Sequence, residues 1–207
     1  MTLLLVLLIF ILGFLNRSYS LLRHKWVGRD TFYHLWIASE IRKTGKLPQQ
    51  VERYPFPETY NVPPFPHIFL ALWPEKYHQK LQLLAPLLDM INGLILYLIC
   101  WRFFGSQVSL MALTLYFFLP MSRDNYYALT SRAFGNTFLV VSLLSLFAFY
   151  LTSNIAALLA ASMAASLVFL THRLTLQSLV AVMLALTIAL WSFFPMIVLI
   201  SGFLLTM

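Results

Sequence analysis

An aspartate and a histidine four positions apart, Asp30 and His34, are the first residues whose types and spacing could do chemistry. Residues at i and i+4 share one face of a helix, so we expect the two side chains to lie one turn apart. A carboxylate at this place can take a proton from a hydroxyl group, as a general base does. From residue type alone, the favoured interpretation of Asp30 is a helix N-cap, because aspartate is a preferred cap. His34 is read either as a functional group or as a packed, hydrogen-bonded histidine.

The helix that carries these residues is expected to start near Asp30 and to end at Gly45 and Pro48, a typical order of helix-ending residues. The surrounding chain is 60% hydrophobic and 10% charged, with a mean hydropathy of +0.80. Soluble domains contain about 25% charged residues, so the composition indicates an integral membrane protein. An apolar helix beside a membrane span is expected in or near the bilayer interface.

The charge of the chain is concentrated in one loop. The formal net charge is +7, and ten of the 14 lysines and arginines lie between Arg17 and Lys80 with five of the seven acids. This pattern indicates attraction to a membrane surface or to an anionic headgroup or phosphate. Nucleic acid is not expected as a partner, because no basic stripe lies outside this mixed-charge loop. The single cysteine, Cys100, excludes an internal disulfide.

The apolar runs predict an all-α bundle of about seven transmembrane spans whose long first loop, 16–80, carries juxtamembrane helices. The spans are expected at 2–15 (continuing toward residue 22), 81–101, 107–121, 137–151, 155–170, 176–191 and 193–207. Residues 1–207 are read as one transmembrane domain. The chain ends within apolar sequence, so we expect it to be the N-terminal part of a longer protein.

Counting the spans places three polar segments, 16–80, 122–136 and 171–175, on the same side of the membrane. The ionisable residues that this places on one face of the bundle, called the mouth below, are Asp30, His34, Arg123, Asp124, Arg132, His172 and Arg173. Arg132 is read either as an interfacial anchor or as a phosphate ligand, and Arg123 with Asp124 as a local ion pair. Charge alone leaves the orientation in the membrane open, because the first loop is as long as the roughly 60 residues within which the positive-inside rule is reliable.

Four patterns carry a resemblance to a known family: Asp30-x-x-Tyr33-His34-x-x-x-Ala38-x-x-Ile41-x-x-x-Gly45-x-x-Pro48, Tyr60-x-x-Pro63-Pro64, Ser131-Arg132-x-x-Gly135 and Thr171-His172. In this order they resemble the N-terminal half of GT-C superfamily membrane glycosyltransferases. That superfamily includes catalytic subunits of oligosaccharyltransferases and mannosyltransferase-like enzymes. The resemblance covers roughly residues 1–190.

The resemblance implies transfer of a sugar from a polyprenyl-phosphate-linked donor to a protein, lipid or glycan acceptor, with inversion at the anomeric carbon. Asp30 would be the general base, and Arg132 would bind the donor phosphate through its guanidinium group. Further donor contacts are expected from Tyr33, His34, Arg123, His172 and Arg173. A divalent metal, Mg²⁺ or Mn²⁺, is left open, with Asp30, His34 and Asp124 as candidate ligands. The implied location is the cell membrane, multi-pass, with the active face external.

Two features depart from the family. The oligosaccharyltransferase subunits carry a C-terminal domain that these residues do not include, and Asn136 stands where an acidic pair would be expected in those subunits. Both features favour a relative that transfers a monosaccharide. Two alternatives from other classes stay open: a transporter or flippase component with Asp89 as its intramembrane coupling residue, and a non-catalytic membrane assembly subunit. For Asp89 itself, a hydrogen bond to a neighbouring helix is the favoured interpretation.

Overall fold

The fold is almost entirely helical, as the sequence predicted. The computed structural model describes residues 2–24, 29–51, 58–59, 62–119 and 130–207. The helices are α1 (Thr2–Arg23), α2 (Arg29–Thr44), α3 (Phe65–Ala71), α4 (His78–Leu81), α5 (Leu84–Phe118), α7 (Ser131–Thr152), α8 (Ile155–Phe169), α9 (Arg173–Ala189) and α10 (Phe194–Leu204), with a 3₁₀ turn at Glu75–Tyr77. Two strands of two residues each, β1 (Gln50–Val51) and β2 (Glu58–Thr59), form an antiparallel pair.

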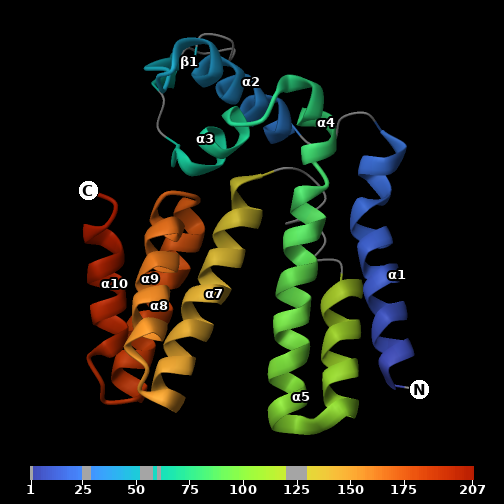
Figure 1. The fold of residues 1–207 in the computed structure, drawn as a ribbon, viewed down its shortest axis with the longest axis vertical. Coiled ribbons are helices and arrows are strands. Elements are labelled where there is room, and N and C mark those ends of the chain that lie inside the picture. The colour runs from blue at the N-terminus through green and yellow to red at the C-terminus, as the bar shows by residue number, and fades with distance from the viewer. Residues whose placement is uncertain (1, 25–28, 52–57, 60–61, 120–129) are drawn as a thin grey trace.

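Three of the described helices, α1, α5 and α7, are long and apolar enough to cross a membrane. The apolar helices α8, α9 and α10 are shorter, and the predicted count of about seven spans stays a prediction. Helix α5 bends sharply at Gly105, whose φ of 82° and ψ of 177° are readily adopted only by glycine. Its two arms then run in opposite directions (Figure 1), so this bend falls within the turn expected at 102–106.

Two polar segments that were assigned to loops belong to helices. The first helix continues toward residue 22 as expected, since α1 runs through the fully buried Arg17 to Arg23, and the first loop therefore begins later than residue 16. Helix α7 begins at Ser131, so the polar residues up to Asn136 form its first turns and not a loop. In both places the polar side chains find partners on other helices, which offsets the cost of taking them out of water.

The long helices lie alongside one another, so that the bundle has two opposite ends (Figure 1). Helices α2, α3 and α4 lie together at one end, which is also the end of the start of α7, the C-terminal end of α1 and the α8–α9 turn. The bend of α5 and the α7–α8 turn lie at the opposite end. The segments that carry the predicted mouth residues His34, Arg132, His172 and Arg173 therefore occupy the same end of the bundle.

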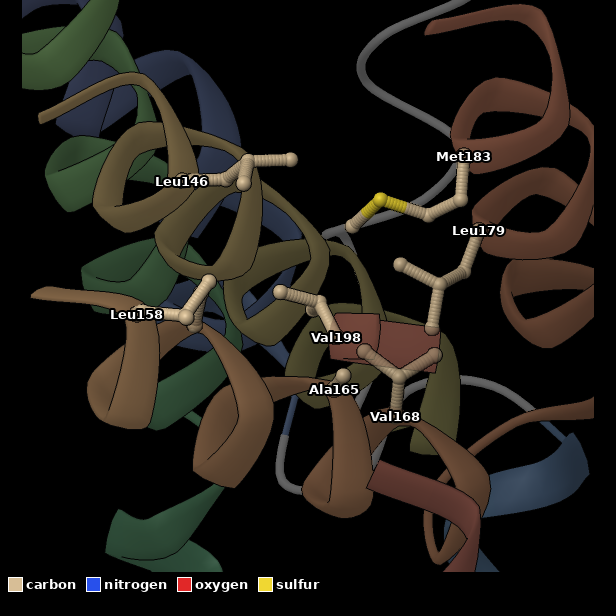
Figure 2. Close-up of a cluster of buried hydrophobic side chains, with 8 residues drawn as sticks. Leu146, Leu158, Ala165, Val168, Leu179, Met183 and Val198 are labelled. Carbon is tan, nitrogen blue, oxygen red and sulfur yellow. The ribbon is translucent and has the colours of Figure 1, made fainter. Parts of the chain in front are cut away.

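The main hydrophobic core joins α7, α8, α9 and α10. Figure 2 shows its side chains converging from these helices: Leu146, Leu158, Ala165, Val168, Leu179, Met183 and Val198. Helix α8, which is rich in alanine, allows the close approach expected of it, since a Cβ on Gly202 of α10 would lie 2.8 Å from that of Ala165. The core fixes α7 and α9 relative to each other, and so positions the side chains at their N-terminal ends.

A buried ion pair joins α1 to α5. Nε of Arg17 donates to Oδ2 of Asp89 at 2.7 Å, and both side chains are fully buried. Tyr116, on the second arm of α5, donates its hydroxyl to the same carboxylate, and its carbonyl accepts from Arg17 at 3.0 Å. This confirms the hydrogen-bonded interpretation of Asp89, whose partners hold α1 and both arms of α5 together.

Candidate functional site

A pair of buried histidines joins α2 to α3. Nδ1 of His34 lies 2.7 Å from Nε2 of His67, and 5% and 0% of the two side chains are exposed. The Tyr33 ring meets both imidazoles edge-on, with centroids 5.6 Å from His34 and 6.0 Å from His67. The helix periodicity explains the burial, because Thr31, His34 and Ala38 share one face of α2 and all three are buried.

The hydrogen bonds of the pair decide which nitrogens carry protons. His67 also makes a hydrogen bond to the backbone of Pro63, which has no N–H, so the imidazole must be the donor there. Nε2 of His67 is then left as the acceptor, and Nδ1 of His34 donates to it. Burial and the nearby charge of His34 lower the pKa of His67 from 6.5 to about 3, so His67 is neutral at pH 7.

Aromatic packing holds the histidine pair against the start of α7. The Phe134 ring lies 5.9 Å from that of Phe65 and 5.5 Å from that of Phe69, both of which belong to α3. The backbone N–H of Phe65 also donates to the carbonyl of Leu170 at 2.9 Å. Helix α3 is therefore tied both to α7 and to the turn before α9.

The first turns of α7 and α9 bring Arg132 close to His172. Burial lowers the pKa of His172, and the charge of Arg132 lowers it further. His172 caps α9: its Nδ1 accepts from the backbone N–H of Thr175 at 3.3 Å. Neutral His172 therefore carries its proton on Nε2 and can donate it to a ligand.

The close approach of α9 requires a glycine in the first turns of α7. A Cβ on Gly135 would lie 2.9 Å from Oγ1 of Thr175 and 3.1 Å from Cβ of His172. The Thr175 hydroxyl donates to Oδ1 of Asn136 at 3.2 Å, which fixes the register of the two helices. The Ser-Arg-x-x-Gly pattern thus has a physical reason here: Gly135 lets α9 come close, and Arg132 precedes it by about one turn of α7.

Chemically, this end of the bundle combines the positive charges of Arg132 and Arg173 with the neutral imidazoles of His67 and His172. Arg132 is half-buried and Arg173 is exposed, and both lie in the first turn of a long helix. The N-terminal end of a helix carries partial positive charge, so two such ends with an arginine each favour an anion such as phosphate.

The predicted site residues are placed only in part. Tyr33 and His34 lie at the α2–α3 contact, while Arg132, His172 and Arg173 lie at the starts of α7 and α9. Asp30 belongs to the first turn of α2, and its side chain lies outside the described part of the structure. Arg123 and Asp124 also lie outside it. Over the part of the chain that is described, no three histidine, cysteine or carboxylate side chains come together as metal ligands, and Mg²⁺ or Mn²⁺ binding stays a prediction.

Sequence reasoning missed the roles of His67, Asn136 and Thr175. His67 follows the Pro63-Pro64 pair by three residues, and its position on the first turn of a helix after two prolines could have indicated a fixed side chain. Asn136 was read only as a departure from a family pattern. Its partner, Thr175, is 39 positions away and has no sequence signal of its own.

Comparison of the chain with protein-family models, with curated proteins and with solved structures gave no match. The resemblance to GT-C glycosyltransferases therefore rests on the sequence patterns alone.

Proposed function

We propose that this protein is a membrane glycosyltransferase, or the N-terminal part of one, that transfers a sugar from a polyprenyl-phosphate donor with inversion. The observation that carries the proposal is the close packing of the start of α7, which carries Arg132, against His172 before α9, at the end of the bundle where α2 and α3 lie. A phosphate at a membrane surface needs cationic and N–H donors, and this end supplies both. The sequence patterns around Asp30 and Arg132 add the family resemblance.

In the proposed reaction, the acceptor hydroxyl attacks the anomeric carbon while the bond from that carbon to the phosphate oxygen breaks. Asp30, in the first turn of α2, takes the proton of the attacking hydroxyl. Arg132 and Arg173 stabilise the charge that develops on the leaving phosphate. His172, neutral at pH 7, donates from Nε2 to a phosphate or sugar oxygen.

The seven-span topology, the external active face and the cell membrane as location are parts of the same proposal. Helices α8, α9 and α10 would cross the bilayer as short spans packed on α7 through the core in Figure 2. The bend at Gly105 would let α5 cross twice. The mouth segments then lie on one face, at the headgroup level where a polyprenyl phosphate presents its sugar.

The transporter alternative has less support than it had from the sequence. It depends on Asp89 as an intramembrane coupling residue, and Asp89 is fully buried in an ion pair with Arg17. That pair gives Asp89 a structural role without any transported ion. Nothing in the described structure favours the assembly-subunit alternative over an enzyme.

The experiment that tests the proposal is transfer of radiolabelled sugar from polyprenyl-phosphate donors in membranes that contain the protein, with Arg132→Gln beside wild type. Loss of a charged hydrogen bond to phosphate should lower transfer at limiting donor by about ten- to a hundredfold. Arg42→Gln, an exposed arginine at the end of α2, is the matched control and should leave transfer unchanged. Equal transfer by Arg132→Gln and wild type would overturn the assignment of Arg132 to the phosphate.

A further inference from the structure

A groove opens between the first arm of α5 and α7, at the end of the bundle opposite to the candidate site. The two helices are held together near the mouth, where Nδ2 of Asn92 donates to Oγ1 of Thr137 at 3.2 Å. Toward the bend of α5 they leave a groove of about 330 Å³ that is apolar throughout. Its lining residues are Ile99, Phe103, Val140, Leu143, Leu144 and Phe147.

The groove continues into a second hollow that has a cation at its edge. This hollow, of about 250 Å³, shares Ile99, Phe103 and Phe147 with the first and adds Arg102. Arg102 is exposed, and its guanidinium carbon lies 5.8 Å from the centroid of the Phe103 ring. Among the residues that the structure describes, no carboxylate forms an ion pair with it. The guanidinium therefore has an unmet preference for an anion.

The level of Arg102 fits a membrane–water interface. The bend of α5 and the turn after α9 carry the exposed tryptophans Trp101 and Trp191, of which 55% and 95% is exposed. Tryptophan is enriched where the hydrocarbon meets the headgroups. The seven acids of the chain all lie elsewhere in the sequence, from Asp30 to Asp89 and at Asp124, so an anion beside Arg102 meets no acid from the neighbouring turns.

We propose that this groove holds one acyl chain of an anionic phospholipid whose headgroup binds Arg102. The groove is apolar, while Arg102 at its edge is cationic and lies at the level of the exposed tryptophans, so the fitting occupant joins an apolar chain to an anionic group. An acyl chain gains little from leaving other lipid tails, because both surroundings are apolar. Selectivity must then come from the headgroup, and Arg102 is the residue that supplies it.

The test uses the purified full chain in neutral detergent and counts bound lipid by native mass spectrometry. Phosphatidylglycerol and phosphatidylcholine with the same acyl chains are titrated separately. Wild type should prefer phosphatidylglycerol by about fivefold, the effect expected of one basic residue near an anionic lipid surface. Arg102→Gln should bind both lipids equally, while Arg23→Gln, an exposed arginine at the other end of the bundle, should keep the preference. Free glycerol phosphate should not displace the lipid, because it has no chain for the groove.

A groove-filling variant tests the acyl chain. Leu144→Trp should abolish retention of both lipids, whereas Leu159→Trp, the same change at an exposed position of α8, should not. A fivefold preference that survives Arg102→Gln would overturn the proposal, as would equal binding of the two lipids by wild type. The proposal would also be overturned if wild type gave the mass of a dimer and Leu144→Trp gave only the monomer, because a second copy of the chain would then fill the groove. If Leu144→Trp fails to fold, the Arg102→Gln comparison still decides.

Discussion

His34 and His67 share a hydrogen bond of 2.7 Å between their imidazoles, although 33 positions separate them in the chain. This contact joins α2 to α3, and α3 in turn packs against the start of α7 through its aromatic side chains. Both rings are out of water, so the pair is stable only in the protonation state that its hydrogen bonds satisfy. The contact adds to the hydrophobic cluster of Leu35, Ala38, Leu70 and Phe134, which also joins α2, the helix of Asp30, to α3 and α7.

The first prediction concerns acid. The pKa of His67 is lowered to about 3 in the folded protein, whereas an unfolded histidine titrates near 6.5. Between these values the unfolded state binds more protons, so stability is fully present above pH 6.5 and falls as the pH drops below it. We expect a loss of up to about 1.4 kcal/mol per pH unit from this group. Thermal unfolding of the detergent-solubilised protein between pH 7.5 and 5 measures it.

Two variants separate His67 from the other titrating groups. His67→Gln should make the unfolding temperature less dependent on pH, although burial also lowers the pKa of His172 and some dependence will remain. His24→Gln, at an exposed position just after α1, should leave the dependence as in wild type. A wild-type unfolding temperature that does not change between pH 7.5 and 5 would contradict this account of the pair.

The second prediction concerns Arg17 and Asp89. Arg17→Met leaves the Asp89 carboxylate buried without its cation, which should destabilise the protein by about 3–5 kcal/mol. The double variant Arg17→Met with Asp89→Leu removes both charges and should recover most of that loss. Lys43→Met, which breaks the exposed pair of Lys43 with Glu40, should change stability by less than about 1 kcal/mol. Unfolding in mixed micelles measures all three, and a double variant less stable than Arg17→Met would refute the ion-pair explanation.

Features of the fold that depend on neighbouring residues were predicted from the sequence, and features that depend on contacts between distant residues were not. Hydropathy located the helices, and Gly105 lies within the turn at 102–106 that the apolar runs indicated. Hydropathy placed the start of the first loop too early at Arg17 and missed the first turns of α7, because it treats polar residues with partners on other helices, such as Arg17 and Asn136, like solvated ones. A usable signal existed for Arg17: an isolated acid such as Asp89 in an apolar helix needs a cation, and Arg17 is the first base after the first apolar run.

For the candidate site, the sequence predicted which residues lie on one face of the bundle, but not which of them contact each other. Span parity indicated that His34, Arg132 and His172 share one face, and the structure brings the segments that carry them to the same end of the bundle. Their pairwise geometry was not predictable. The contact of His34 with His67 joins residues 33 positions apart on two helices, and no local pattern encodes how those helices pack.

The third prediction concerns topology. If α5 crosses the bilayer twice, its bend and the α7–α8 turn face one side, and the first loop faces the other. In a Cys100→Ser background, Ser106→Cys and Ser153→Cys should react with an impermeant thiol reagent from the same side of sealed vesicles. Lys46→Cys, just after α2, should react only from the opposite side. Labelling of Ser106→Cys and Lys46→Cys from one side would exclude the double crossing.

The most direct test of the central claim is sugar transfer from a polyprenyl-phosphate donor by wild type and by Asp30→Asn at equal expression. Asparagine keeps the shape of the side chain and its capping oxygen but cannot take a proton. Loss of a general base should lower transfer by about 10²–10⁴-fold. Glu40→Gln, the matched change ten residues along the same helix, should leave transfer intact. Undiminished transfer by Asp30→Asn would contradict the account and return Asp30 to helix capping.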